Sequence, residues 1–193
     1  METVKHILIA FAMTWMIIGQ PASAREIADI SIPDAVKPDA AGEELILNGA
    51  GIRKKFFFKI YVGALYLRTP STDAGAILAA GGPWRVYMHI LHTEIEREKL
   101  VAAWNEGFAG NNSDSRLATL KPRLDTFNGM FTTVKQGDRI VLDYLPTTGT
   151  RVQVNDVNKG TIAGEDFQQA LLSVWLGEKP ADKGLKKGML GAD

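Results

Sequence analysis

The chain has 193 residues, no cysteine, and 22 basic residues balanced by 22 acidic ones, so its formal net charge is zero. This length suits one domain with a sizeable core. The neutral balance gives no electrostatic reason to expect a nucleic acid or an anionic membrane as partner, and the lack of cysteine excludes disulfides, thiol nucleophiles and thiolate metal ligands.

The N-terminal segment has the pattern of a secretory signal peptide. Lys5 precedes an apolar run over residues 7–18, and Ala22-Ser23-Ala24 fits the small-x-small rule for cleavage. We expect cleavage after Ala24 and a single domain over residues 25–193. The run is short for a bilayer span, which needs about 20 residues, so a retained anchor or a buried helix is the alternative. Export without cysteine suits a bacterial periplasm, and we expect a periplasmic or secreted protein.

The first half of this domain favours strands. Residues 25–41 predict a leader with one short strand, and Asn48-Gly49 predicts a turn. The aromatic and β-branched segment 54–68 predicts a strand, in which Gly63 indicates a bulge or a close approach of backbone or ligand. Residues 84–92 alternate between apolar and polar, as in a half-buried antiparallel strand.

The remaining elements are mostly helices. Helices are predicted over residues 71–80, 93–108, 115–128 and 164–176, with Pro122 marking a kink or restart. The segments "DRIVLDYL" and "TRVQVNDV" predict a hairpin around residues 146–149. The tail after Gly177 predicts a loose segment. Strands mixed with helices and joined by hairpins predict an α+β fold with an antiparallel sheet.

Familiar catalytic and metal-binding patterns are absent from the sequence. It contains no GxSxG, HExxH, Walker or GxGxxG motif. His89 and His92 are three residues apart on a predicted strand, so they face opposite sides and cannot clasp one metal. We therefore expect no metal site and no cofactor.

The stretch "LNGAGIRKKFFFKIYVGALYL" resembles the signature of the chalcone isomerase family. In that family a strand with Gly-x-Arg precedes one that ends in Gly-x-x-Tyr-hydrophobic. The likeness continues through "EKLVAAWNEGF" and "GEDFQQALLSVWLGE". It implies an open-faced β-sandwich, in which helices are layered on one face of a large antiparallel sheet and a ligand lies between them. The family includes plant enzymes, catalytically silent relatives, plant fatty-acid-binding proteins and bacterial homologues.

The resemblance also assigns positions to a site. Arg53 matches the arginine that attracts and orients the substrate in the enzymes. Their threonine becomes Tyr61, their tyrosine and asparagine become His92 and Lys99, and the Ser/Thr of the last helix falls near Val174. Because each lost donor costs of order 10²-fold or more in rate, these changes favour a non-catalytic protein.

An arginine and a tyrosine are what the fatty-acid-binding relatives use to hold a carboxylate. A guanidinium matches two carboxylate oxygens, and a phenol adds a third donor. We therefore expect the ligand to be a small amphipathic anion such as a fatty acid, and we expect neither a nucleic acid partner nor stable membrane insertion after signal cleavage. The residues expected to bind the ligand are Arg53, Tyr61, Tyr66, Trp104, Phe108 and Trp175.

Arg53 and Tyr61 can act as a clamp on one carboxylate only if the chain reverses between them, because eight residues of straight strand span about 26 Å. A hairpin centred near Phe57 would place them opposite each other, about 5 Å apart, although no Gly or Pro marks that turn. The alternative is that Arg53 pairs with Glu94 or Asp166 and that Tyr61 is ordinary core.

Two other functions stay open at this point. One is a chalcone isomerase-type intramolecular lyase, with Arg53 as electrophile and His92 or Tyr61 moving the proton. The other is a structural or partner-binding protein with a filled core and no cleft.

Overall fold

A computed structural model describes residues 24–39 and 42–192, so the expected signal peptide lies outside the described residues except for Ala24. The main sheet has seven antiparallel strands in the order β11-β10-β9-β6-β5-β4-β3. These strands are β3 (Ala35–Val36), β4 (Leu45–Lys55), β5 (Phe58–Leu67), β6 (Trp84–Ile90), β9 (Arg139–Leu145), β10 (Gly149–Val154) and β11 (Val157–Ile162).

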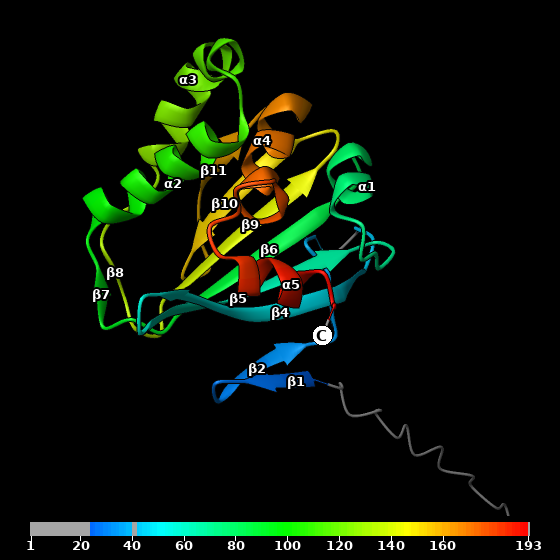
Figure 1. Ribbon diagram of the computed structural model, residues 1–193. Helices are drawn as coiled ribbons and strands as arrows, with labels where there is room; N and C mark the ends of the chain where they lie inside the picture. Colours follow the sequence, from blue (N-terminus) through cyan, green and yellow to red (C-terminus); the bar gives the residue numbers. More distant parts are fainter. Residues whose placement is uncertain (1–23, 40–41, 193) are drawn as a thin grey trace, which may run out of the picture.

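Helices cover one side of this curled sheet, as Figure 1 shows, which confirms the expected α+β fold with helices layered on one face. They are α1 (Ala74–Ala79), α2 (Arg97–Asn111), α3 (Asp114–Asn128), α4 (Glu165–Leu176) and α5 (Lys183–Met189). Two short ribbons accompany the sheet: β1 (Ala24–Ile27) with β2 (Ile30–Pro33), and β7 (Glu94–Ile95) with β8 (Val134–Lys135).

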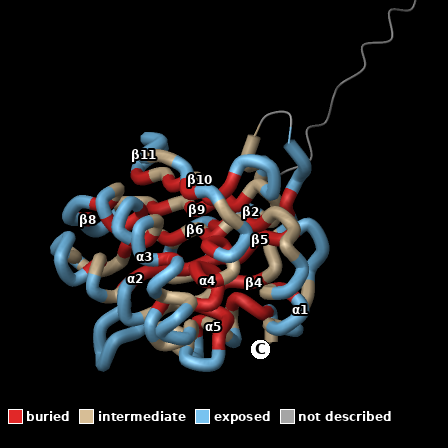
Figure 2. Tube along the Cα trace, turned by 90° about the horizontal axis from the view of Figure 1, so that it is seen from above, coloured by how far each residue is buried: buried red, intermediate tan, exposed pale blue. Residues whose placement is uncertain are grey.

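The core has two parts, one on each side of the sheet. The larger part lies under the helices, and α4 is its most deeply buried helix, as the red tube in Figure 2 shows. The smaller part lies on the other side and joins Ile32 of β2 to Ala50, Val62 and Tyr66 of the β4–β5 pair. Since side chains alternate along a strand, β5 contributes to both parts.

Several sequence predictions need correction here. Residues 25–41 hold three short strands where one was expected. Asn48-Gly49 lies inside β4 and forms a bulge, because Asn48 is the residue skipped in the pairing with β5. Helix α2 begins at Arg97, after the short strand β7, and α3 runs through Pro122 as one helix.

The tail is the largest correction. It was expected to be loose, but α5 lies against β4 and β5. The Asn48 amide donates to the carbonyl oxygen of Met189 at 2.7 Å and also bonds Ser71. Gly63, expected at a bulge or close contact, sits where an added Cβ would be 3.1 Å from Leu185. The absence of a side chain at Gly63 therefore allows α5 to approach the sheet.

Candidate functional site

The reversal that the clamp requires is present between β4 and β5. Arg53 and Tyr61 are direct cross-strand partners, and the loop between the strands is Phe56-Phe57. No glycine is needed because Phe56 itself takes a left-handed conformation, with φ at 54°. The predicted hairpin near Phe57 is therefore confirmed.

A bulge next to the turn sets the direction of the side chains. Arg53 pairs with Tyr61 but Lys54 pairs with Lys59, so Ile60 is an extra residue on β5. A bulge lets two successive residues face the same side. Ile60 and Tyr61 are accordingly both buried in the larger core cluster and both line one cavity.

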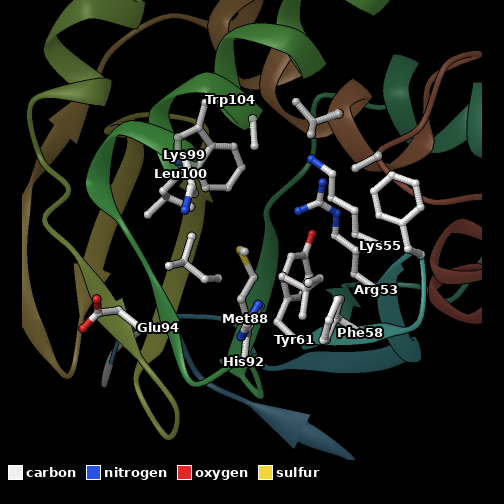
Figure 3. A pocket seen from close by; sticks show the side chains of 16 residues that line it. Arg53, Lys55, Phe58, Tyr61, Met88, His92, Glu94, Lys99, Leu100 and Trp104 are labelled. Atoms are coloured by element: carbon white, nitrogen blue, oxygen red, sulfur yellow. The ribbon is translucent and has the colours of Figure 1, made fainter.

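The cavity has a volume of about 320 Å³ and lies between the β4–β5–β6 strands and helices α2 and α4. In Figure 3 its floor is formed by β-strand residues such as Tyr61 and Met88, and Leu100 and Trp104 come from α2. The full lining consists of Arg53, Lys55, Phe56, Phe58, Ile60, Tyr61, Met88, His92, Glu94, Ile95, Lys99, Leu100, Ala103, Trp104, Val174 and Ala181.

Arg53 is a cation without an acidic partner in the described part of the chain. Its Nε is buried and makes no hydrogen bond, and its guanidinium carbon lies 5.7 Å from the centre of the Tyr61 ring. The two candidate acids are otherwise engaged: Asp166 binds Arg123, and Glu94 lies 3.7 Å from Lys135. The alternative that Arg53 is neutralised by either acid is therefore wrong.

Tyr61 is oriented as a hydrogen-bond donor. Its hydroxyl accepts a hydrogen bond of 2.9 Å from the Trp175 indole N–H, which leaves its own proton free for another acceptor. Burial raises the pKa of Tyr61 above its usual value of 10.0, against the opposing effects of Arg53 and Trp175. The phenol is therefore neutral at physiological pH, and in Figure 3 its oxygen points toward the Arg53 guanidinium.

Trp104 carries a second unpaired donor that sequence reasoning missed. Its Nε1 is buried and has no hydrogen-bond partner among the described residues. Its ring is held by edge contacts to Phe127 and Trp175, at 5.4 and 5.7 Å between centroids. No sequence signal distinguishes a satisfied from an unsatisfied indole, because the partner comes from distant segments.

The chalcone isomerase-like family matches residues 24–191. This chain belongs to the chalcone isomerase-like family. Among solved structures, a fatty-acid binding protein of Arabidopsis thaliana matches with a TM-score of 0.68 and 15% identity, over 87% of this chain and 96% of the plant chain. At this identity the likeness establishes the shared fold. No curated protein sequence matches the chain.

The five positions assigned from the chalcone isomerase enzymes all meet in the cavity. Arg53, Tyr61, His92, Lys99 and Val174 line it, although they come from five separate segments. The structure thus brings the five positions that the resemblance assigned together around one cavity.

Three other residues expected at the ligand do not line the cavity. Tyr66 faces the smaller core cluster, because it lies five residues beyond Tyr61 on a strand that pairs with β6 without a bulge. Phe108 is fully buried one turn beyond Trp104 and packs on Phe167, with 5.5 Å between ring centroids. Trp175 acts behind the cavity wall, through its bond to Tyr61.

His92 and Lys99 are the polar residues at the rim of the cavity, and each has a contact with a neighbouring side chain. His92 stacks on Phe58, with the ring centroids 5.6 Å apart. Lys99 is exposed and pairs with Glu96 at 3.1 Å.

Within residues 24–39 and 42–192, no cluster of His, Asp and Glu could hold a metal ion, and no helix is long and apolar enough to cross a membrane.

Proposed function

We propose that this protein is a non-catalytic carrier that binds a fatty acid, or a similar amphipathic carboxylate, in the cavity between the sheet and α2. The observation that carries the proposal is the Arg53 guanidinium, which has a buried nitrogen without a partner beside the neutral Tyr61 hydroxyl. Arg53 as a whole is half-buried, but a polar nitrogen withdrawn from water without a partner is costly, and a bound anion would offset this cost.

The head group of such a ligand would find complementary donors. Arg53 presents a planar fork that suits two carboxylate oxygens, and the Tyr61 proton can reach a third lone pair. Bonds of this kind to a charged group contribute about 1.5–3 kcal/mol each. The fatty-acid binding protein with the same fold makes this ligand class a natural first choice.

The hydrocarbon part of the ligand would lie along the apolar wall. Met88, Leu100, Trp104 and Val174 contribute to this wall. The volume of about 320 Å³ is at the lower end of the usual range for ligand pockets, roughly 300–1,000 Å³. We therefore expect medium-length chains to bind better than long ones. The alternative of a purely structural protein assumes a filled core, and the cavity argues against that assumption.

Substitution of the arginine tests the head-group contact. We expect Arg53→Ala to weaken binding of decanoic acid, a saturated medium-chain fatty acid, by at least about 10-fold, because both charge-assisted bonds of the guanidinium are lost. The measurement is titration calorimetry of decanoic acid into the purified protein, which gives the dissociation constant directly.

Two controls make this test specific. Arg68→Ala removes an exposed arginine that pairs with Glu43 outside the cavity, and it should leave the affinity unchanged. An alcohol of the same chain length should bind wild type and Arg53→Ala equally, since it has no carboxylate. Equal fatty-acid affinity in wild type and Arg53→Ala would rule out the clamp.

We also propose that the protein is exported and acts in the periplasm or outside the cell. The support is the N-terminal pattern of Lys5, the apolar run and Ala22-Ser23-Ala24. Cell fractionation with N-terminal analysis of the mature chain tests this, and a cytoplasmic protein that retains Met1 would contradict it.

An intramolecular lyase is the second candidate, because His92 lines the same cavity as Arg53 and could move a proton. Against it stand the neutral Tyr61 and the loss of the other enzyme donors. Ring closure of naringenin chalcone, measured with wild type and Arg53→Ala, decides this question. An Arg53-dependent rate above the spontaneous one would favour the enzyme.

A further inference from the structure

The tip of the β4–β5 hairpin displays three consecutive phenylalanines to solvent. Phe56, Phe57 and Phe58 are 86%, 99% and 61% exposed. A single exposed aromatic residue is unremarkable, but a contiguous apolar patch marks a contact surface. These rings are also continuous with the cavity, since Phe56 and Phe58 form part of its lining.

The backbone conformation at the tip is unfavourable for a phenylalanine at position 56. Phe56 has a φ of 54°, a region that suits glycine or asparagine and disfavours bulky side chains. A glycine there would close the same turn with less strain. The phenyl ring is therefore not required by the fold, and strained residues of this kind tend to occur at functional sites.

Three lysines surround the rings. Lys54, Lys55 and Lys59 are exposed, and none has an ion-pair partner among the residues that the structure describes. Asp182 accepts a hydrogen bond from the Lys54 backbone, not from its ammonium group, and Glu94 pairs with Lys135. The chain is neutral as a whole, but this end of it is locally basic.

We propose that this tip, residues 54–59, is a docking surface for an anionic lipid bilayer. The phenyl rings would enter the interfacial layer, where aromatic side chains are favoured, and the lysines would lie against negatively charged headgroups. Three phenyl rings offer less than the roughly 800 Å² per partner that a stable protein interface buries, since each contributes about 150–250 Å². The charge pattern and the small area thus favour a lipid surface over a protein.

Docking in this orientation would place the cavity entrance at the membrane. Lys55, Phe56 and Phe58 lie at the edge of the cavity next to Arg53, as Figure 3 shows for the labelled Lys55 and Phe58. A fatty acid could then pass between bilayer and cavity without crossing water. This transfer step rests on the proposed function, whereas the membrane contact depends on the tip alone.

Vesicle flotation tests the membrane contact. Vesicles of phosphatidylcholine alone are compared with vesicles that also contain phosphatidylglycerol. Wild type should bind the anionic vesicles, and added salt should weaken this binding. Phe57→Ser, and separately Lys54→Ser with Lys59→Ser, should each reduce the partition coefficient about tenfold. Matched controls at exposed positions of the edge strand β11, Val157→Ser and Lys159→Ser, should bind like wild type.

The readouts separate this proposal from the ligand proposal. Phe57, Lys54 and Lys59 do not line the cavity, so their variants should keep the wild-type affinity for decanoic acid in solution. All proteins carry the same N-terminal segment, so a difference between their partition coefficients comes from the substituted residues. If the tip variants float as wild type does, the docking surface is ruled out. The same holds if wild type does not bind vesicles but forms a dimer that Phe57→Ser abolishes.

Loss of vesicle binding in the tip variants alone supports docking even when no form of the protein binds decanoic acid. In that case the membrane contact stands and the fatty-acid proposal falls.

Discussion

At the residue scale, the site depends on which polar groups lack partners. Arg85, Arg123, Arg139 and Arg151 each bind an acidic side chain, whereas Arg53 does not in the described part of the chain. The same contrast separates Trp104 from Trp175, whose indole N–H binds Tyr61. A buried donor without an acceptor costs about 1–3 kcal/mol, and a bound ligand would offset this cost.

The buried tyrosines predict how stability responds to alkaline pH. Burial raises the pKa of Tyr66 above 10.0, so the folded chain keeps its proton where the unfolded chain loses it. The resulting stabilisation is present below about pH 10 and is lost as pH rises toward the folded pKa. Tyr66→Phe removes this hydroxyl. Between pH 8 and pH 11 its free energy of unfolding should therefore fall by about 1.4 kcal/mol less than that of wild type.

Urea unfolding at the two pH values measures this difference. Tyr66 is a suitable choice because its hydroxyl makes no hydrogen bond to another described residue and does not line the cavity. Equal losses in wild type and Tyr66→Phe would mean that this hydroxyl titrates in the folded protein as it does in water.

At the scale of elements, two bulges in the β4–β5 pair, one on each strand, organise the site. The bulge at Asn48 exposes an amide that holds Ser71 and Met189, and the shift beside Arg53 turns Ile60 and Tyr61 toward the cavity. The glycines of β4 let α5 approach, and the chain leading into α5 provides Ala181 to the cavity lining.

This close approach predicts a strong effect of a small substitution. A Cβ at Gly49 would collide with the Gly188 carbonyl oxygen and would lie 2.7 Å from the Gly191 nitrogen. Since both neighbours are backbone, Gly49→Ala should lower the free energy of unfolding by about 1–3 kcal/mol. Gly82→Ala is the matched control, because nothing lies within 4 Å of its added Cβ. A stable Gly49→Ala protein in urea unfolding would show that α5 does not rest on β4 in this way.

At the scale of the whole molecule, a buried ion network ties the segment before β4 to the middle of the sheet. Asp143 is fully buried and binds Arg85 of β6 at 2.6 Å and Arg151 of β10 at 2.9 Å. Arg151 in turn binds Asp39 and the carbonyl oxygen of Pro38. The network lies outside the cavity lining and therefore supports the fold rather than the ligand.

Removing the negative charge of Asp143 should destabilise the folded protein. Asp143→Asn leaves two arginines without their shared carboxylate, and we expect the free energy of unfolding to fall by about 3 kcal/mol or more. Glu43→Gln, which removes the exposed partner of Arg68, should change it by less than about 1 kcal/mol. Urea denaturation compares the two. A loss for Asp143→Asn as small as that for Glu43→Gln would mean that water screens the network.

The features of the fold that were predicted correctly depend on patterns within single segments of the chain. The sequence alone predicted the alternating strand β6, the amphipathic helix α4 and the antiparallel α+β class, because each rests on a period of two or 3.6 residues within one segment. It also singled out Arg53 and Tyr61, through the resemblance to a family. The turn at Phe56 carried no signal, since a phenylalanine there has no local reason to adopt a positive φ.

Only the tertiary structure decided which groups are paired and which are free. The bonds from Asn48 to Met189 and from Trp175 to Tyr61 join residues 141 and 114 positions apart. The unpaired nitrogens of Arg53 and Trp104 likewise depend on which other segments pack around them. Periodicity states which face of a segment is buried, but the partner of a buried group is set by the packing of segments that share no sequence pattern.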